Sequence, residues 1–423
     1  MWIAIIIVST VLATVVVVLV VLNLTTEEKK LVDPLRPDYQ VGEAQFDRSM
    51  GSLLEPPLIE GNHVQPLING DEIFPAMLDA IRQARRTITM ETYVYWAGDI
   101  GKCFADGLSE RARAGVDVHV LLDWAGSMKM DHDFLKQMRA AGVEVEKYHP
   151  PRWYNLDRIN NRTHRKLLIV DGRVGFTGGV GIADAWAGNA DSPNNWRDTH
   201  FQVQGPVVAQ MQAAFIDNWL QTHAMVLHGE GYFPRLELIG SQRAQMFKSS
   251  ARSGSGNTRL MYLLSIAAAT SSIRIGNAYF VPDDLSVQTF VEACHRGVDI
   301  EIIVPGPLID KSIVRRASRA RWGKLLEAGV RIYEYQPTMY HCKIMVVDEQ
   351  WTSVGSTNFD NRSFRLNDEA NLNVMDRALA RDQLRCFEHD KQRSTQLTLE
   401  GWRNRPVHEK VIEHMAALLR AQV

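Results

Sequence analysis

A short motif occurs twice in this chain, and the distance between its copies sets the scale of the fold. The second copy repeats the spacing of the first. A Gly-Gly or Gly-Ser pair begins seven residues after the last position of each copy. The copies lie 177 residues apart, which is the length of a domain and far longer than a solenoid repeat. We therefore expect two copies of one fold. The motif residues are His164, Lys166 and Asp171, and then His341, Lys343 and Asp348.

Each copy has the pattern of a β-strand that enters a turn. Residues 167–170 and 344–347 are apolar and rich in β-branched side chains. Side chains two positions apart on a strand share a face, so the His and Lys of each copy should point the same way. Two such strands facing each other would place two imidazoles between two ammonium groups. That arrangement suits a phosphodiester, because lysines neutralise its oxygens while one histidine attacks phosphorus and the other moves a proton.

A plainer interpretation exists for each motif residue taken alone. A His near a Lys at the start of a strand is usually an ordinary surface residue, and an Asp before Gly is usually a turn residue. Recurrence of the whole spacing favours a functional site, so all six motif residues enter the candidate catalytic set. Within that set, we interpret Asp171 and Asp348 as turn and salt-bridge residues and not as chemical actors.

The two halves match again downstream of the motifs. Residues 201–203 correspond to residues 372–374 at an offset of 171, which aligns Asp198 with Glu369. A histidine that acts as nucleophile or proton carrier needs an acceptor for its other ring nitrogen. Asp198 and Glu369 are candidates for that supporting role, and the alternative is a surface acid that begins a strand.

Alternating strand and helix patterns in both halves predict an α/β fold. We expect two pseudo-symmetric domains, each a mixed β-sheet flanked by helices, preceded by one transmembrane helix. The final helix should begin at Pro406 and bury a stripe of Val407, Val411, Met415, Leu418 and Leu419. The expected division is a transmembrane anchor at 1–24, a linker at 25–66, a first domain at 67–223, a connection at 224–257 and a second domain at 258–423.

Two surface segments leave alternatives open. Residues 311–324 carry six basic side chains, which could meet anionic lipid head groups or form an ordinary solvated helix face. Residues 151–163 contain Trp153 and Tyr154 among arginines, and form either a lipid-facing rim beside the site or an ordinary loop.

The N-terminal stretch has the composition of a membrane anchor. Residues 1–24 hold no charged side chain, and ~20 apolar residues in a helix span a ~30 Å hydrocarbon core. Lys29, Lys30 and Arg36 follow this stretch, so the positive-inside rule places the catalytic part in the cytoplasm. The four scattered cysteines fit reduced thiols, and the net charge of −2 argues against a nucleic-acid partner.

The doubled pattern His-x-Lys-x4-Asp-x6-Gly-[Gly/Ser] resembles the signature of the phospholipase D superfamily. Residues 177–184 and 355–363 are similar to the bacterial cardiolipin synthase branch in particular, and the resemblance runs from about Pro66 to the C-terminus. It implies a phosphatidyltransferase of the bacterial inner membrane that uses phosphatidylglycerol and other phospholipids. No metal or other cofactor is expected, since the two lysines would carry the charge.

The resemblance also implies roles for individual residues. His164 would form a phosphohistidine with the phosphatidyl group of one phosphatidylglycerol, and His341 would protonate the departing glycerol and activate the hydroxyl of a second. Lys166, Lys343 and Asn358 would hold phosphoryl oxygens, and Ser356 belongs to the supporting set. By the same resemblance, the downstream acids orient the imidazoles.

One departure and several alternatives remain at this stage. Gly181 stands where the family often has Asn, so a side-chain donor is missing from the first half. Either a backbone N–H replaces this donor, or the two half-sites have become unequal. A phospholipase D-type hydrolase that releases phosphatidic acid is the alternative function, ahead of a nuclease or a membrane scaffold. The sequence alone leaves open the donor and acceptor lipids, the choice of nucleophile, the membrane sidedness and the oligomeric state.

Overall fold

The two halves of the sequence form the same series of strands. The computed structural model describes the chain except residues 1, 25–30, 32, 152–159, 251–255 and 419–423. The first half provides β1 (Ile59–Ile68), β2 (Thr87–Thr92), β3 (Asp117–Asp123), β4 (Glu144–Tyr148), β5 (Arg162–Thr163), β6 (Leu167–Val170), β7 (Val174–Gly178) and β8 (Thr199–Gln204). The second half provides β9 (Gln242–Ser249), β10 (Ser272–Asn277), β11 (Asp299–Pro305), β12 (Arg331–Tyr335), β13 (Lys343–Val347), β14 (Trp351–Gly355), β15 (Asn367–Met375) and β16 (Ser394–Leu397).

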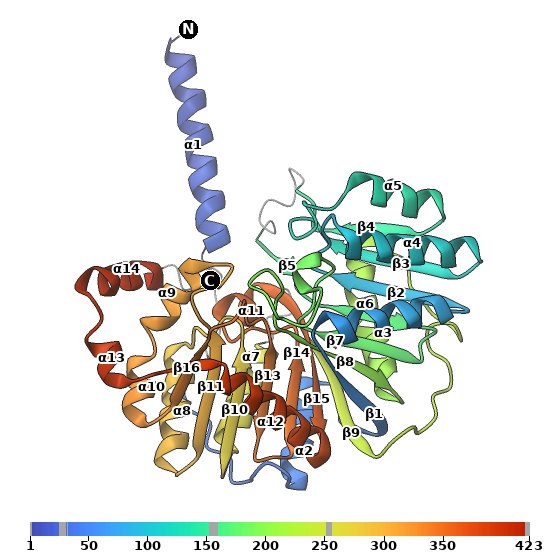
Figure 1. The fold of residues 1–423 in the computed structure, drawn as a ribbon. Helices are drawn as coiled ribbons and strands as arrows, with labels where there is room; N and C mark the ends of the chain where they lie inside the picture. The colour runs from blue at the N-terminus through green and yellow to red at the C-terminus, as the bar shows by residue number, and fades with distance from the viewer. Residues whose placement is uncertain (1, 25–30, 32, 152–159, 251–255, 419–423) are drawn as a thin grey trace.

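These strands join into one continuous mixed sheet (Figure 1). Its order is β16-β12-β11-β10-β13-β14-β15-β9-β1-β8-β7-β6-β2-β3-β4. The strands from β12 to β9 and the strands from β4 to β1 follow the same order of equivalent strands, so the two halves repeat one arrangement. In each half two adjacent pairs are parallel, β2–β3–β4 and β10–β11–β12. The antiparallel pair of β1 with β9 connects the halves. We expected two related mixed sheets, one in each domain, but the structure has a single continuous sheet made of two equivalent parts.

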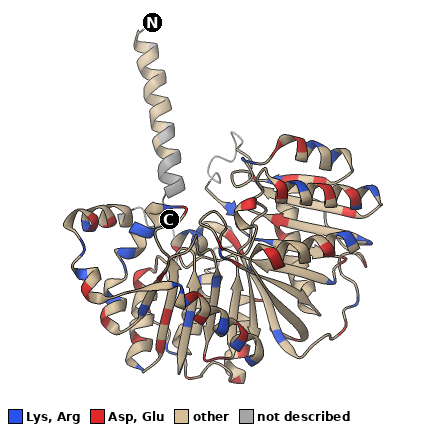
Figure 2. Cartoon of the chain, viewed as in Figure 1, with Lys and Arg blue, Asp and Glu red and all other residues tan. Residues whose placement is uncertain are grey.

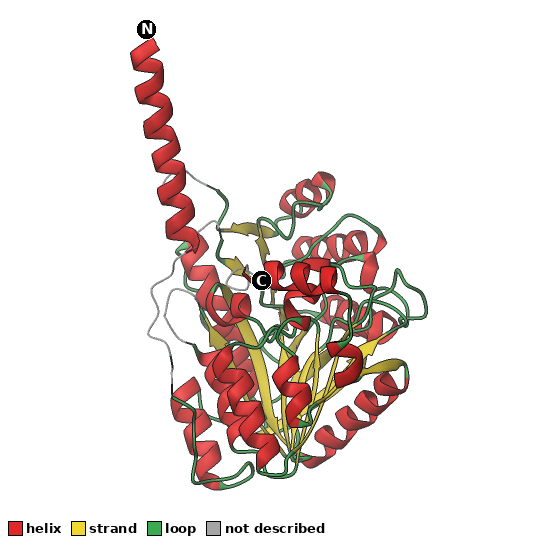
Figure 3. Cartoon of the chain, turned by 90° about the vertical axis from the view of Figure 1, so that its left-hand side faces the viewer, coloured by secondary structure: helices red, strands yellow, loops and turns green. Residues whose placement is uncertain are grey.

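Helices cover both faces of the sheet (Figure 3). The first half adds α3 (Asn69–Gln83), α4 (Asp99–Arg113), α5 (His132–Ala140) and α6 (Val207–His223). The second half adds α7 (Asn257–Ala267), α8 (Asp284–His295), α9 (Ser312–Arg319), α10 (Gly323–Ala328), α11 (Asn361–Arg365), α12 (Arg377–Gln392), α13 (Leu399–Arg403) and α14 (Val407–Leu418). Gly115 and Gly297 follow α4 and α8 with φ near +90°, a backbone conformation that glycine adopts without steric cost.

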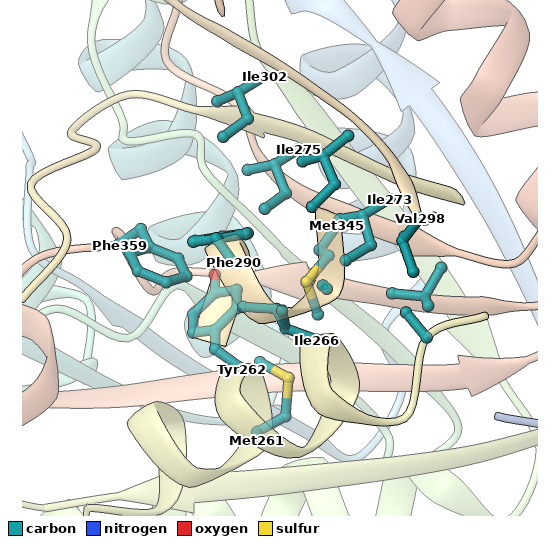
Figure 4. Packing of buried hydrophobic residues seen from close by; sticks show 14 of the residues in the cluster. Met261, Tyr262, Ile266, Ile273, Ile275, Phe290, Val298, Ile302, Met345 and Phe359 are labelled. Carbon is teal, nitrogen blue, oxygen red and sulfur yellow. The ribbon is translucent and has the colours of Figure 1, made fainter. Parts of the chain in front are cut away.

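The hydrophobic core has a separate cluster in each half and a third cluster that joins them. In the second half, Ile273, Ile275 and Ile302 of the sheet pack against Phe290 of α8 and Tyr262 of α7 (Figure 4). The joining cluster contains Met211 and Phe215 of α6 together with Met246 of β9 and Leu372 of β15. Because α6 packs on strands of both halves, separating the halves would expose this apolar surface to water.

The segments expected as a linker and a connection contain parts of the folded core. Residues 25–66 include α2 (Ala44–Leu54) and most of β1, and residues 224–257 include β9. Phe46 of α2 is buried with its ring 5.0 Å from that of Trp351, edge to face, in the core of the second half. The proline and charge content of residues 25–66 indicated a linker, but the buried face of α2 is set by contacts with residues 200 or more positions away.

At the N-terminus, α1 (Trp2–Leu24) projects from the body (Figures 1 and 3). Among the residues that the structure describes, no helix is both long and apolar enough to cross a bilayer, so the membrane-spanning helix expected at residues 1–24 is not confirmed.

The apolar stripe of α14 faces outward, which corrects the expectation that it is buried. Val407, Val411 and Met415 are 74%, 53% and 63% exposed. The opposite side of the helix packs on α9, where Ala416 meets an apolar cluster and Glu413 pairs with Arg319 and Arg405. The ion pairs therefore select which side of α14 is buried. Leu418 and Leu419, also expected in the stripe, have side chains outside the described part.

Three of the six basic side chains at residues 311–324 form ion pairs within the described part of the protein, and Figure 2 shows many basic residues along α9. Arg315 and Arg319 both pair with Glu334, and Arg321 pairs with Asp284. These contacts favour a structural role for the arginines over a lipid-binding one. The proposed aromatic rim at Trp153 and Tyr154 lies outside the described residues.

We predict that Phe46→Ala lowers the free energy of unfolding by about 3–5 kcal/mol, because it leaves a cavity beside Trp351. Urea unfolding followed by tryptophan fluorescence measures this change. Leu53→Ala on the same helix is the control, since Leu53 is exposed and its truncation should cost less than about 0.5 kcal/mol. Equal effects of the two variants would show that α2 is not part of the cooperative core.

Candidate active site

Backbone pairing between the halves brings the two motifs to the same end of the sheet. The peptide N–H of His164 donates to the carbonyl of Asp368 at 2.9 Å, as β5 runs parallel to the start of β15. The N–H of His341 donates to the carbonyl of Arg197 at 2.8 Å in the equivalent way. Each motif is thus held against the segment that precedes the acid of the other half.

The consequence is a crossed pairing of histidines and carboxylates. Nδ1 of His164 lies 3.0 Å from both carboxylate oxygens of Glu369. Nδ1 of His341 lies 2.8 Å from Oδ2 of Asp198. Sequence alignment of the halves identified both acids, but not that each serves the histidine of the other half. With Nδ1–H donating to a carboxylate, Nε2 of each ring keeps its lone pair for chemistry.

Both motif lysines are buried beside the histidines. Nζ of Lys166 donates to the carbonyl oxygen of His164 at 2.8 Å, and Nζ of Lys343 donates to that of His341 at 2.6 Å. Nζ of Lys343 is also 3.2 Å from Nε2 of His341. Both residues of the first copy precede β6, and in the second copy only Lys343 lies on a strand, as the first residue of β13. The predicted strand periodicity therefore does not by itself place each His beside its Lys.

The imidazoles are neutral in this environment. Burial, together with the ammonium groups of Lys166 and Lys343, holds the pKa of His164 well below its usual value. Burial and Lys343 lower the pKa of His341 to about 4, although Asp198 opposes the shift. A neutral imidazole whose Nε2 carries a lone pair is the form that can attack phosphorus or accept a proton.

The two carboxylates differ in their ionisation. Burial opposes the charge on Asp198, but His341 and Lys343 hold its pKa below the usual value. Burial raises the pKa of Glu369 to about 7, against the opposing effect of Lys166. Burial likewise lowers the pKa of Lys166 to about 7, against the opposing effect of Glu369. Glu369 and Lys166 therefore both change protonation state near neutral pH, whereas Asp198 stays ionised.

Hydrogen bonds fix each carboxylate in a different way. Glu369 accepts from the Ser356 hydroxyl and from the Asn367 amide at 3.2 Å. Asp198 accepts from the indole N–H of Trp186 at 3.0 Å and from the peptide N–H of Thr199 at 2.8 Å. Ser356 thus occupies the supporting position expected from the sequence.

Glycines in the first half leave room for the hydrogen bonds of Asp198. A Cβ on Gly179, which corresponds to Ser356, would lie 2.2 Å from Oδ1 of Asp198. A Cβ on Gly181, which corresponds to Asn358, would lie 2.7 Å from Val94 and 3.1 Å from the Trp186 ring. Trp186 therefore fills the space of the missing asparagine, and its indole N–H donates to Asp198. The half-sites are unequal, which was one of the two alternatives left open by the sequence.

Asn358, expected to hold phosphoryl oxygens, is buried close to the second motif. Its peptide N–H donates to the Ser363 hydroxyl at 3.2 Å. Its amide oxygen makes no hydrogen bond among the residues that the structure describes. That oxygen is an acceptor and could not itself hold a phosphoryl oxygen, which needs the amide N–H groups, so the phosphoryl contact of Asn358 stays a prediction.

The motif aspartates lie at the opposite end of their strands from the histidines, so their inclusion among the catalytic residues is corrected. Asp171 accepts from the peptide N–H groups of Arg86 and Thr87, at 2.7 and 3.0 Å. Asp348 accepts in the same way from residues 270–272 at 2.8–2.9 Å. Both have φ near +50°, as expected for turn residues. Their described partners are N–H and hydroxyl groups and not basic side chains, so the salt-bridge part of the interpretation is not met.

Aromatic residues that the sequence did not single out pack on the histidines. The Tyr93 ring lies 5.3 Å from that of His164, and Nζ of Lys166 lies 5.8 Å from the centre of the same ring. Trp186 and Trp196 each lie 5.3 Å from the His341 ring. Tyr93 directly follows β2, but no local pattern distinguishes it from other aromatic residues. Among the described residues, no group of His, Cys, Asp and Glu is arranged to bind a metal ion.

Comparison with known proteins agrees with this geometry. The sequence model of the family described as "Cardiolipin synthase, PLD-like domain" matches residues 77–219 and 262–391, one match in each half. The chain belongs to this family of phospholipase D-like cardiolipin synthases. It is 33% identical to cardiolipin synthase 2 of Bacillus anthracis, over 84% of this chain and 69% of that protein. It is 34% identical to the major cardiolipin synthase ClsA of Bacillus subtilis, over 85% and 75%.

A solved structure supports the fold. The crystal structure of a phosphatidylserine synthase from Haemophilus influenzae superposes with a TM-score of 0.69 and 14% identity, covering 90% of this chain and all of that one. At this identity the likeness concerns the fold alone.

We predict that Asp198→Asn lowers kcat for phospholipid turnover by at least about 100-fold, because the amide no longer stabilises a protonated His341. Steady-state kinetics with phosphatidylglycerol measure the change. Asp133→Asn on α5 removes an exposed carboxylate and should leave kcat unchanged. A folded Asp198→Asn variant with kcat within threefold of the parent would exclude Asp198 as a positioning residue.

Proposed function

We propose that the protein is a cardiolipin synthase that transfers a phosphatidyl group from one phosphatidylglycerol to a hydroxyl of another. The observation that carries the proposal is the pair of neutral imidazoles, each held by a buried carboxylate of the other half and flanked by a buried lysine. The curated relatives named as cardiolipin synthases support the substrate class.

The first step forms a covalent intermediate. Nε2 of His164 attacks phosphorus, a phosphorus–nitrogen bond forms, and the bond from phosphorus to the glycerol oxygen breaks. His341 gives that oxygen a proton, and glycerol leaves. A phosphate between Lys166 and Lys343 adds negative charge beside His341, which raises the pKa of its imidazole and allows it to carry the proton.

The second step reverses the proton transfer with a new alcohol. The terminal hydroxyl of a second phosphatidylglycerol gives its proton to His341, its oxygen bonds to phosphorus, and the bond to His164 breaks. The products are cardiolipin and the restored enzyme. The lysines and Asn358 stabilise the charge on the phosphoryl oxygens in both steps. Glu369 and Asp198 keep the reactive Nε2 atoms oriented and stabilise a charged ring.

A phospholipase D-type hydrolase is the second candidate function. It would use the same first step and let water accept the phosphatidyl group, giving phosphatidic acid. No feature of the described site favours water over an alcohol.

We predict that purified protein with phosphatidylglycerol in mixed micelles forms cardiolipin and glycerol in equal amounts, measured by thin-layer chromatography and enzymatic glycerol assay. His164→Ala and His341→Ala should each lower the rate at least about 1,000-fold, since each removes an obligatory group. His63→Ala, which changes an exposed histidine of β1, is the matched control.

Two outcomes would contradict this function. Phosphatidic acid as the main product would establish the hydrolase, and near-normal turnover by either motif variant would refute a shared site. The nucleophile is identified separately, because label from the phosphatidyl group should remain on the parent protein after a rapid quench and be absent from His164→Ala.

We further propose that the enzyme works at the bacterial inner membrane, with residues 1–24 as a single-pass anchor and the catalytic part in the cytoplasm. The uncharged apolar composition of residues 1–24 supports the anchor. The outward-facing stripe of α14 supports contact with lipid, since α14 lies at the end of the body from which α1 projects (Figure 1).

We predict that removal of residues 1–24 moves most of the protein from the membrane pellet to the supernatant after cell lysis.

In the truncated protein, Val411→Asp with Met415→Asp should weaken the remaining binding to phosphatidylglycerol vesicles at least tenfold, measured by vesicle flotation. Leu238→Asp, at another exposed apolar position, is the control. Unchanged pelleting of the truncated protein in about 1 M salt, where the Debye length is only ~3 Å, would refute the anchor.

A further inference from the structure

An exposed carboxylate lies beside the site and has no role in the mechanism above. Asp310 is in the loop between β11 and α9, after the carboxyl end of a parallel strand. The hydroxyl of Tyr279 donates to it, 2.7 Å from each carboxylate oxygen. Tyr279 is itself buried, whereas Asp310 is exposed, so the protein fixes the carboxylate from behind and leaves its other face to solvent.

Packing connects this pair to His341. Tyr279 belongs to an apolar cluster with Met339, and Trp196 packs against the same cluster. The Trp196 ring lies 5.3 Å from that of His341. The pKa of His341, lowered mainly by burial, is partly restored by the negative charge of Asp310, and the same charge acts on Lys343. The charge of Asp310 also acts on Tyr93, which packs on His164, so electrostatics alone does not assign it to one histidine. The packing of Tyr279 and Trp196 connects it to His341, where the proposed mechanism places the alcohol.

The chemistry of the surroundings limits what Asp310 can bind. A carboxylate repels a phosphate group and accepts hydrogen bonds from hydroxyls at its four lone-pair positions. Nζ of Lys311 lies 5.4 Å from the centre of the Tyr279 ring, so a positive charge is already present nearby. An uncharged donor such as a hydroxyl fits this environment better than an ammonium group.

We infer that Asp310, held by Tyr279, binds the secondary hydroxyl of the glycerol head group whose terminal hydroxyl reacts at His341. This inference rests on the proposed function and specifies its acceptor. In the transfer step the terminal oxygen bonds to phosphorus, its proton goes to His341, and the bond to His164 breaks. The secondary hydroxyl stays intact and donates to Asp310. The same contact serves the glycerol that leaves in the first step, since its path is the reverse of the entry path.

The experiment measures how the phosphatidyl group of the covalent enzyme intermediate is distributed among competing acceptors. Full-length protein and phosphatidylglycerol in mixed micelles receive labelled glycerol, 1-propanol and ethanolamine at equal concentration, and all phosphatidyl products and phosphatidic acid are quantified together. 1-Propanol has the same chain length as glycerol but lacks its secondary hydroxyl and its second terminal hydroxyl. The variants are Asp310→Asn, Tyr279→Phe and, as a charge-matched control, Asp382→Asn on α12.

We expect the parent to prefer glycerol over 1-propanol, and Asp310→Asn to lower this preference about tenfold, the effect of losing one hydrogen bond to a charged group. Tyr279→Phe should lower it less, and Asp382→Asn should not change it. An unchanged preference in a folded Asp310→Asn variant would overturn the inference. A parental preference for ethanolamine that Asp310→Asn abolishes would also overturn it, because the carboxylate would then bind an ammonium group. A parent that forms only phosphatidic acid would refute the proposed function itself.

Discussion

The crossed contacts between histidines and carboxylates are the interaction on which the site depends. Glu369 of the second half orients His164, and Asp198 of the first half orients His341. Neither half can therefore assemble its own histidine in a reactive state. The exchange of acids requires the continuous sheet, in which β1 and β9 join the halves and α6 packs on both. The position of each imidazole is thus coupled to the stability of the whole domain pair.

This arrangement buries several charged groups in a small volume. Lys166, Lys343, Asp198 and Glu369 are all almost fully buried, and an isolated charge in such surroundings would be costly. Opposite charges and fixed hydrogen bonds offset that cost, while burial and the nearby lysines lower the pKa of both histidines. The site therefore holds neutral imidazoles beside two buried lysines at the place where a phosphate would bring negative charge.

Duplication of the fold did not give two identical half-sites. Ser356 donates to Glu369, while the corresponding Gly179 only makes room for Asp198. Asn358 has its counterpart in Gly181, whose space Trp186 fills. The two carboxylates consequently differ in ionisation, with the pKa of Glu369 raised to about 7 and that of Asp198 lowered. Unequal halves suit a reaction in which one histidine bonds to phosphorus and the other only moves protons.

The sequence by itself determined the features that depend on local spacing. The repeated spacing identified each His with its Lys, the repeated offsets defined two equivalent halves, and alignment of those halves found Asp198 and Glu369. The tertiary structure alone decided which acid meets which histidine, that Asp171 and Asp348 lie at the far ends of their strands, and that α14 turns its apolar stripe outward. It also fixed Asp310 on Tyr279, where its charge acts on His341. These features depend on contacts between residues far apart in the chain, and a local pattern carries no information about which distant partner a side chain will meet.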